Sequence, residues 1–275
     1  MRDTASGVIW VNLPVILAFT SAVRLVLVRA SDLNIARARI FSDAARGLAL
    51  IQGAEASAMA ALRRDMIAAP AVDHLRESWT EVGQSETRIE GGTFALDIPD
   101  AQSRVNLDSL TGSGVVGTQT LTPIAAWLEL PQDTAPRILA RLATGNPLRA
   151  PDHLIPEAGP SPETLARLQN LVTLVPGRQV INLNTAPADL IFARADNPVQ
   201  ALSLTSSRNG YLTSGDVVTA YVILPAGTGF ISPFYEITTL VTVGRISQSR
   251  RRLLWHHQNN AGLPDVAVIA RNTKP

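Results

Sequence analysis

Glycines, histidines and carboxylates are the residues of this chain whose spacing could support catalysis or ligand binding. Gly112, Gly114 and Gly117 match the glycine spacing of a dinucleotide-binding loop. Such a loop opens a helix inside a strand–helix–strand unit, and the residues after Gly117 do not predict an opening helix. His256 and His257 are adjacent in a strand-like run, so they point to opposite faces and cannot share one metal ion. Neither pattern predicts a nucleotide or metal site.

Composition narrows the functional classes further. The chain has 275 residues, of which 46% are hydrophobic and 17% charged, and its formal net charge is +1. Nucleic-acid binding usually requires a strongly basic face, so no nucleic-acid partner is expected. The absence of cysteine excludes disulfides, thiolate metal sites and a cysteine nucleophile. No ordered catalytic triad, paired-carboxylate cluster or phosphate loop is evident either. We therefore expect a protein that is not an enzyme, with no catalytic residues and no metal.

One short phrase occurs twice in the chain. Residues 104–110 read RVNLDSL, and residues 180–187 read VINLNTAP. Each is an apolar, strand-like run that ends in asparagine and continues with a small polar residue able to start a helix. In the second copy a side chain at 184 or 185 is expected to cap the helix, with Pro187 in its first turn. The predicted structural motif consists of Asn106, Asp108, Asn182, Asn184 and Thr185.

The second copy and its helices are also similar to a helix-hairpin-helix module, which grips DNA phosphates through backbone amides in other proteins. The hairpin glycine is absent here, because residues 194–198 read RADNP. Asp189 and Asp196 would repel phosphate. A structural use of the motif is favoured, and a periplasmic DNA-binding protein is one alternative.

The elements that position these motifs begin with an apolar N-terminal segment. Residues 8–28 are mostly apolar with the single charge Arg24, and a bilayer span needs roughly 20 such residues. An ordinary secretory signal is the alternative interpretation. Residues 30–69 lack proline and repeat apolar side chains with the helical period. If residues 8–69 form one continuous helix, it is about 90 Å long, and two unrelated helices are the alternative. Pro14 and Gly47 are positions where it could bend.

The remainder predicts an α+β domain that carries a helical insertion. A hairpin is expected over residues 87–98, and residues 250–252, three arginines, are expected in a solvated turn. Helices are predicted at residues 122–128, 135–142, 161–168 and 187–204. Strands are predicted at residues 217–223, 235–243, 252–255 and 266–270.

The N-terminus resembles a type IV prepilin signal: a short polar leader ends at Gly7, and the apolar stretch starts at Val8. The resemblance implies that a prepilin peptidase cuts between these two residues. Most pilins have glutamate at mature position five, where this chain has Asn12. A buried carboxylate needs a partner, which a neighbouring subunit's terminal amine supplies. A tip subunit has no neighbour above it, so Asn12 fits a subunit at the tip of a filament.

The order of motifs along the chain resembles the K-type minor pseudopilins of type II secretion, the general secretion pathway protein K family. The matching stretches are residues 105–110, 162–177, 181–187 and 232–237. The resemblance implies a pilin-like fold, in which a long hydrophobic helix packs on an antiparallel sheet, with a large helical insertion of the SAM-like or helix-hairpin-helix-like type. It also implies a single-pass inner-membrane protein whose C-terminal domain is periplasmic.

The same resemblance implies the partners and the division of the chain. The protein would cap a short pseudopilus together with I- and J-type minor pseudopilins and help to initiate its assembly and protein export. The expected segments are the leader 1–7, the membrane helix 8–28, the first part of the pilin-like domain 29–105, the helical insertion 106–215 and the final strands 216–275. An alternative is a minor pilin of a type IV or competence pilus, which would be smaller.

Calcium is the one cofactor that the family resemblance brings up, because some members bind it in an acid-rich loop of the insertion. The corresponding residues here, 130–134, read LPQDT and offer too few carboxylates for the six to eight oxygens of a calcium site. We therefore expect no cofactor, with calcium as the alternative that the resemblance leaves open.

Overall fold

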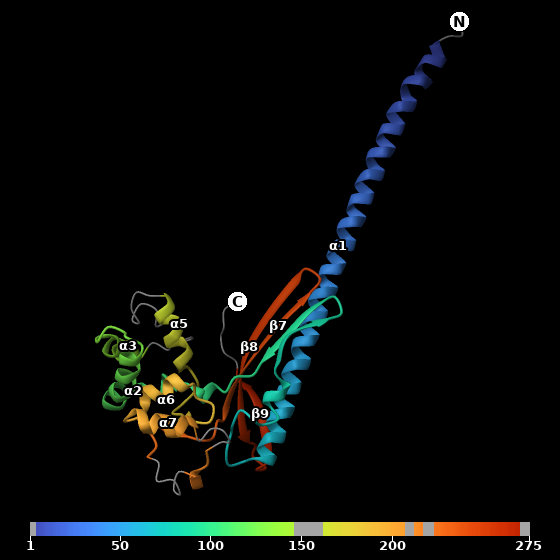
Figure 1. The fold of residues 1–275 in the computed structure, drawn as a ribbon. Helices are drawn as coiled ribbons and strands as arrows, with labels where there is room; N and C mark the ends of the chain where they lie inside the picture. Colours follow the sequence, from blue (N-terminus) through green and yellow to red (C-terminus); the bar gives the residue numbers. More distant parts are fainter. Residues whose placement is uncertain (1–3, 146–161, 207–211, 217–222, 270–275) are drawn as a thin grey trace.

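The computed structural model describes residues 4–145, 162–206, 212–216 and 223–269. It does not describe the side chains of residues 4–13, 162, 164 and 165. The molecule consists of a long helix, a sheet that packs against the C-terminal half of this helix, and a separate helical lobe beside the sheet (Figure 1). The N-terminal half of the helix projects away from both, and its side chains from Val15 to Val28 are exposed and mostly apolar (Figure 1).

Helix α1 runs from Thr4 to Ala68, which confirms the prediction of one long helix ending just before Pro70. Its 65 residues span about 100 Å at 1.5 Å per residue. Pro14 lies inside the helix without ending it. In the C-terminal half, small side chains at helical spacing are fully buried and let the sheet approach closely. These are Ala54, Ala58 and Ala61, followed by Leu62.

The sheet is antiparallel throughout, with strand order β1-β2-β7-β8-β9 in the described residues. Its strands are β1 (Gln84–Ile89), β2 (Gly92–Asp97), β7 (Phe234–Val243), β8 (Ile246–Gln258) and β9 (Pro264–Ile269). The predicted hairpin over residues 87–98 is confirmed by the pairing of β1 with β2. The predicted strand at 217–223 lies, apart from its last residue, outside the described residues.

One strand differs from its prediction. We expected residues 252–255 as a strand and the arginines at 250–252 as a turn, but β8 includes all of these residues. The turn lies instead at Gly244, whose φ of 56° is in the left-handed region that favours glycine. Arg250 and Arg252 lie two positions apart on β8, so both side chains point to the same face, toward α1. Their guanidinium nitrogens lie 3.6 and 3.7 Å from the Glu55 carboxylate. An ion pair with the helix, rather than solvent, accounts for these charges.

The helical lobe is inserted between β2 and β7. It contains α2 (Gly114–Trp127), α3 (Thr134–Ala143), α5 (Pro162–Leu171), α6 (Ala188–Arg194) and α7 (Pro198–Ser206). Two parallel two-residue ladders tie it together, β3 (Val105–Asn106) with β4 (Val172–Thr173) and β5 (Ile181–Asn182) with β6 (Thr228–Gly229). Short 3-10 turns complete the described elements at Thr80–Val82, Ala101–Ser103 and Asp108–Leu110.

Each part of the molecule has its own hydrophobic core. Between α1 and the sheet, Trp79 and Tyr235 are fully buried and meet edge to face with ring centroids 5.0 Å apart. In the lobe, apolar side chains from α2, α3, α5, α6 and α7 form a second core. One face of α2 and one face of α7 stay exposed. Its largest buried members are Leu107, Ile124, Ile138, Leu183, Leu190, Ile191 and Leu204. Where the two parts meet, a smaller apolar cluster of Ala101, Val175, Phe234 and Leu253 accompanies the polar residues that join them.

Candidate functional site

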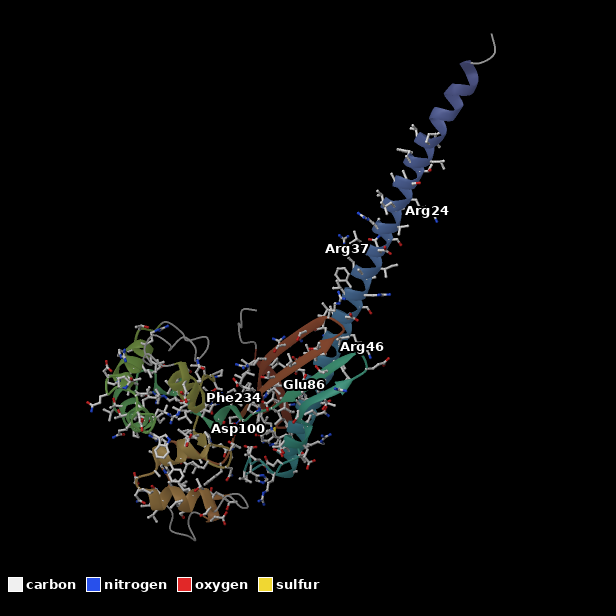
Figure 2. All side chains as sticks on the ribbon, turned by 45° about the horizontal axis from the view of Figure 1, so that its top comes forward. Arg24, Arg37, Arg46, Glu86, Asp100 and Phe234 are labelled. Carbon is white, nitrogen blue, oxygen red and sulfur yellow. The ribbon has the colours of Figure 1, made fainter. Side chains whose placement is uncertain are left out.

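The first functional feature is the outer half of α1. Among the described residues this is the one helix long and apolar enough to cross a membrane. Its side chains from Val15 to Val28 are exposed, although most of them are apolar. Figure 2 shows Arg24 and Arg37 along this free part of the helix and Arg46 where the sheet begins. Gly7, Val8 and Asn12 lie in the first turns of α1, and the structure describes only their backbone.

The second feature is how the two copies of the repeated phrase fold. Asn106 Oδ1 accepts the N–H of Asp108 at 3.2 Å, and Asn182 Oδ1 accepts the N–H of Asn184 at 2.9 Å. In both copies the asparagine ends a short parallel ladder and closes an Asx turn two residues on. The repeated sequence thus marks a repeated local structure.

The first copy fastens the loop after β4. Asn106 Nδ2 donates to the carbonyls of Val175 at 3.0 Å and Gly177 at 2.8 Å, and its Oδ1 accepts the Val175 N–H at 3.1 Å. The Asp108 carboxylate accepts the Gly177 N–H at 3.0 Å. Asn106 therefore satisfies the buried backbone groups of Val175, and Asp108 holds the same loop from its exposed side.

In the second copy the prediction that Asn184 or Thr185 caps a helix is wrong. Helix α6 has Pro187 at its N-cap and no side-chain cap. Asn184 instead pairs with the backbone of Leu212, accepting its N–H at 2.8 Å and donating to its carbonyl at 3.0 Å. The Thr185 hydroxyl donates to the Asp100 carboxylate. Both side chains find partners distant in sequence, which compete successfully with the local helix terminus.

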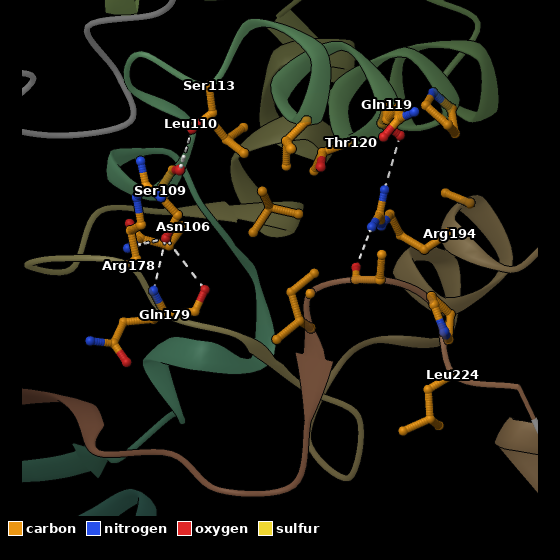
Figure 3. Close-up of a pocket in the computed structure, with 18 of the residues that line it drawn as sticks. Asn106, Ser109, Leu110, Ser113, Gln119, Thr120, Arg178, Gln179, Arg194 and Leu224 are labelled. Atoms are coloured by element: carbon orange, nitrogen blue, oxygen red, sulfur yellow. Dashed lines mark hydrogen bonds between the residues drawn. The ribbon is translucent and has the colours of Figure 1, made fainter.

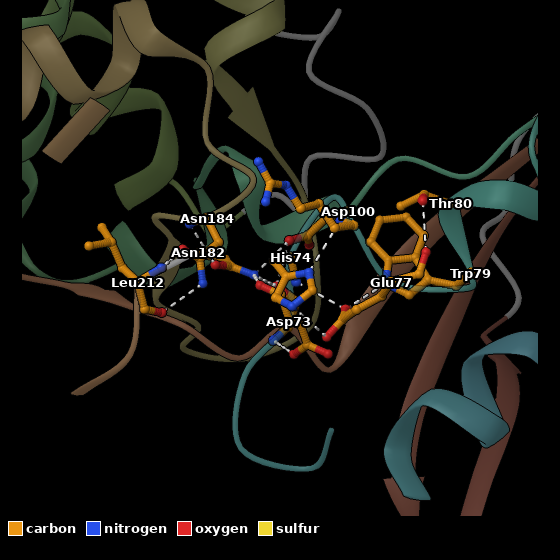
Figure 4. A network of polar contacts seen from close by, with 11 residues as sticks. Asp73, His74, Glu77, Trp79, Thr80, Asp100, Asn182, Asn184 and Leu212 are labelled. Atoms are coloured by element: carbon orange, nitrogen blue, oxygen red, sulfur yellow. Dashed lines mark hydrogen bonds and ion pairs between the residues drawn. The ribbon is translucent and has the colours of Figure 1, made fainter. Parts of the chain in front are cut away.

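The third feature is a buried network between the sheet and the lobe, which we call the polar junction: Asp73, Asp100, Asn182, Thr185 and Ser232. Figure 4 shows Asp73, Asp100 and Asn182 of this network. Asp100 Oδ2 accepts hydrogen bonds from Thr185, from Ser232 Oγ at 2.6 Å and from Asn182 Nδ2 at 3.1 Å. Asp100 Oδ1 accepts the Gln102 N–H at 2.7 Å. Burial raises the pKa of Asp100, and these four hydrogen bonds oppose that shift.

Next to the junction lies a cluster of three carboxylates, Asp65, Asp73 and Glu77, which we call the acidic cluster. All three are buried, and a ligating oxygen from each lies within 4.8 Å of the others. Burial, followed by the nearby Glu77 carboxylate, raises the pKa of Asp65 to about 7. Burial likewise raises the pKa of Asp73 to about 7, against the Ser232 N–H hydrogen bond that lowers it.

An open cleft of about 760 Å³ lies in the lobe, bordered by the first phrase copy, α2 and α6 (Figure 3). Arg194 crosses it and donates to the carbonyls of Gln119 at 3.0 Å and Ala226 at 2.6 Å. Burial lowers the pKa of this arginine. Asp196 is the one carboxylate among the described lining residues, and they include no histidine. The described lining therefore pairs no histidine with a carboxylate, and Arg194 serves to hold segments together.

The glycine-rich stretch in the lobe forms a different structure from the one predicted. A helix does open within it, because α2 starts at Gly114 and continues through residues 118–123. The element before it is the 3-10 turn Asp108–Leu110, so the strand required by a dinucleotide fold is absent at this point. A Cβ on Gly117 would overlap the side chain of Leu139. This glycine permits close packing of α2 on α3.

Sequence reasoning did not identify the acidic cluster or the central role of Asp100. Asp65 lies in the last turn of α1, Asp73 and Glu77 lie in the next loop, and Asp100 follows β2. No short motif joins these positions. The sequence offered one indication: three acidic residues lie in the mostly apolar stretch 65–77, and Asp73 and Glu77 are four residues apart.

Comparison with protein-family models and with curated protein sequences gives no match. Among solved structures, the chain is similar to one in the crystal structure of the GspK-GspI-GspJ complex from the type 2 secretion system of enterotoxigenic Escherichia coli. The TM-score is 0.62 at 18% sequence identity, over 85% of this chain and 98% of the other. This likeness shows the fold: a pilin-like α+β architecture with a long N-terminal helix, an antiparallel sheet and further helices.

Proposed function

We propose that the protein is a minor pseudopilin at the tip of a type II secretion pseudopilus, where it helps to initiate pseudopilus assembly and protein export. The observation that carries the proposal is the insertion of a complete helical lobe between β2 and β7 of a pilin-like sheet. The similar solved chain comes from a complex of three proteins of such a secretion system and is covered almost entirely. The described lining of the lobe's cleft has one carboxylate and no histidine, which favours a role other than catalysis.

The proposal includes how the protein is processed and placed. A prepilin peptidase removes residues 1–7 by cutting between Gly7 and Val8, and the apolar part of α1 anchors the mature chain in the inner membrane. The sheet and lobe then lie in the periplasm, where they bind I- and J-type minor pseudopilins. The exposed apolar side chains of α1 support this arrangement, because they need lipid or neighbouring subunits to cover them.

The mature N-terminus tests the proposal most directly. Mass spectrometry of protein from cells with an intact prepilin peptidase should find a chain that begins at Val8. A chain that begins near Val23 or Ala30 would identify an ordinary secreted protein and overturn the proposal. Replacing Gly7 with a bulky residue should block both cleavage and secretion, and normal secretion by that variant would contradict it.

Co-purification separates this proposal from its alternative, a minor pilin of a type IV or competence pilus. With the I- and J-type subunits of its own secretion system co-expressed, the full chain should be recovered in a complex with both. Binding to pilus subunits instead would favour the alternative.

A further inference from the structure

The acidic cluster brings three like charges together in a buried position. Asp65, Asp73 and Glu77 are only 3%, 3% and 6% exposed. Carboxylates so close together in an apolar setting cannot all stay ionised without a positive charge beside them. The cluster therefore needs either protons or a cation.

In the described residues a basic side chain contacts the cluster at Glu77 rather than at Asp65 or Asp73. No ion pair joins Asp65 or Asp73 to a basic side chain in the described part of the chain. Glu77 Oε1 has His74 Nε2 at 3.8 Å, beyond hydrogen-bond distance. The other ring nitrogen, Nδ1, accepts the Arg76 N–H at 3.2 Å.

Some carboxylate oxygens of the cluster accept hydrogen bonds, and other oxygens of the cluster have no donor. Glu77 Oε2 accepts the His74 N–H at 2.9 Å and the Trp79 indole N–H at 2.8 Å. Glu77 Oε1 and Asp65 Oδ2 are buried and have no hydrogen-bond partner. In metal sites, hydrogen bonds to one oxygen of a carboxylate often orient the other oxygen toward the ion. Glu77 has this arrangement, with Oε2 hydrogen-bonded and Oε1 unpaired.

A residue outside the cluster points to the same place. Tyr235 on β7 is completely buried, and its hydroxyl lies beside the Asp73 carboxylate without a hydrogen bond of standard geometry. A buried hydroxyl with no partner is rare in folded proteins. A cation between the hydroxyl and the carboxylates would satisfy it together with the unpaired oxygens.

We propose that Asp65, Asp73 and Glu77, together with the Tyr235 hydroxyl, bind a calcium ion. The donors are all oxygens, which hard divalent cations prefer. Three carboxylate oxygens and a hydroxyl supply four of the roughly six to eight oxygens that Ca²⁺ takes, and waters can complete the shell. Mg²⁺ is usually bound by only one or two carboxylates. The site joins the end of α1, the following loop and β7, so the ion would fasten the anchor helix to the sheet. It lies apart from residues 130–134, and it does not depend on the proposed function.

The test uses the full chain in detergent, freed of metal with a chelator and titrated with Tb³⁺. Trp79 donates directly to Glu77, so excitation of tryptophan should give sensitised terbium emission that Ca²⁺ displaces. Calcium at a hundredfold excess over its Kd should also raise the Tm by about 5 °C. Absence of both the emission and the Tm shift would overturn the proposal.

Variants place the ion. The double variant Asp65→Asn, Glu77→Gln keeps the shapes of the side chains and relieves their repulsion, so it should fold. It should bind Tb³⁺ at least about a hundredfold more weakly and lose the calcium-dependent Tm shift. The matched control is Glu86→Gln, an exposed carboxylate on β1, which should behave like the wild type. Emission that persists unchanged in the double variant would assign the ion to another site and contradict the proposal.

Discussion

Asn182 Nδ2 donates a hydrogen bond of 3.1 Å to Asp100 Oδ2 across 82 residues of sequence. Asp100 lies just after β2, where the chain leaves the sheet, and Ser232, which bonds to the same carboxylate oxygen at 2.6 Å, lies just before β7, where it returns. One buried carboxylate thus joins the exit, the return and the second copy of the repeated phrase. In Figure 2, Asp100 and Phe234 lie together between the sheet and the lobe. The polar junction holds the inserted lobe on the sheet.

Replacing Asn182 with alanine should therefore lower stability more than its size suggests. The change leaves buried partners of Asn182 Nδ2 and Oδ1 unsatisfied, including Asp100 and the Asn184 N–H. We expect a loss of about 3 kcal/mol, because each buried polar group left without a partner costs about 1–3 kcal/mol. Thermal unfolding measures it, with Asn170→Ala, an exposed position on α5, as the control. Equal Tm values for the two variants would show that the junction does not hold the lobe.

Replacing Gly53 or Gly92 with alanine should change the stability of the protein in opposite directions. Gly92 begins β2, and a Cβ there would overlap the carbonyl of Thr242 on the neighbouring strand. Gly53 is exposed in α1, and a Cβ there would meet no atom within 4 Å. Gly53→Ala should add about 0.5–1 kcal/mol of stability, as alanine is the better helix former. Gly92→Ala should instead lower the Tm, and a neutral result would mean that β2 and β7 can separate without loss.

The pH dependence of stability should carry a contribution from His256. Burial, followed by the neighbouring His257, lowers the pKa of His256 from 6.5 to about 4 in the folded chain. Between these values the unfolded chain takes up a proton at this residue and the folded chain does not, so stability falls as the pH falls from 6.5 to 4. Above pH 6.5 the contribution is constant. His256→Gln should reduce this slope in Tm measured across the window, and an unchanged slope would assign it to other groups.

Much of the fold follows from local sequence patterns, because period and turn residues determine local structure. The helical spacing up to Pro70 and the Gly91-Gly92 turn predicted α1 and the first hairpin correctly. The errors arose where distant partners decided the outcome. Arg250 and Arg252 read as solvated until α1 brings Glu55 beside them. Thr185 reads as a helix cap until Asp100 supplies a buried acceptor.

The candidate site also contains residues that the sequence could identify and residues that it could not. The asparagines of the repeated phrase were identifiable because a repeat is visible in one sequence. The acidic cluster was not, because Asp65, Asp73 and Glu77 meet only after α1 packs against the sheet, and Tyr235 reaches them from a strand more than 150 residues further on. Such a juxtaposition depends on strand order, and the placement of β7 beside β2 is a property of the whole fold.

The residue at mature position five tests the proposed place at the filament tip. If the subunit has no neighbour above it, a carboxylate at Asn12 would lie in apolar surroundings without the terminal amine that pairs with it elsewhere in a filament. Asn12→Glu should therefore reduce secretion several-fold, whereas Asn12→Gln, which adds the same length without charge, should leave it near the wild-type level. The measurement is the amount of exported cargo in the medium at equal levels of each variant. Full secretion with Asn12→Glu would mean that a neighbouring amine is available, which places the subunit within the shaft of the filament rather than at its tip.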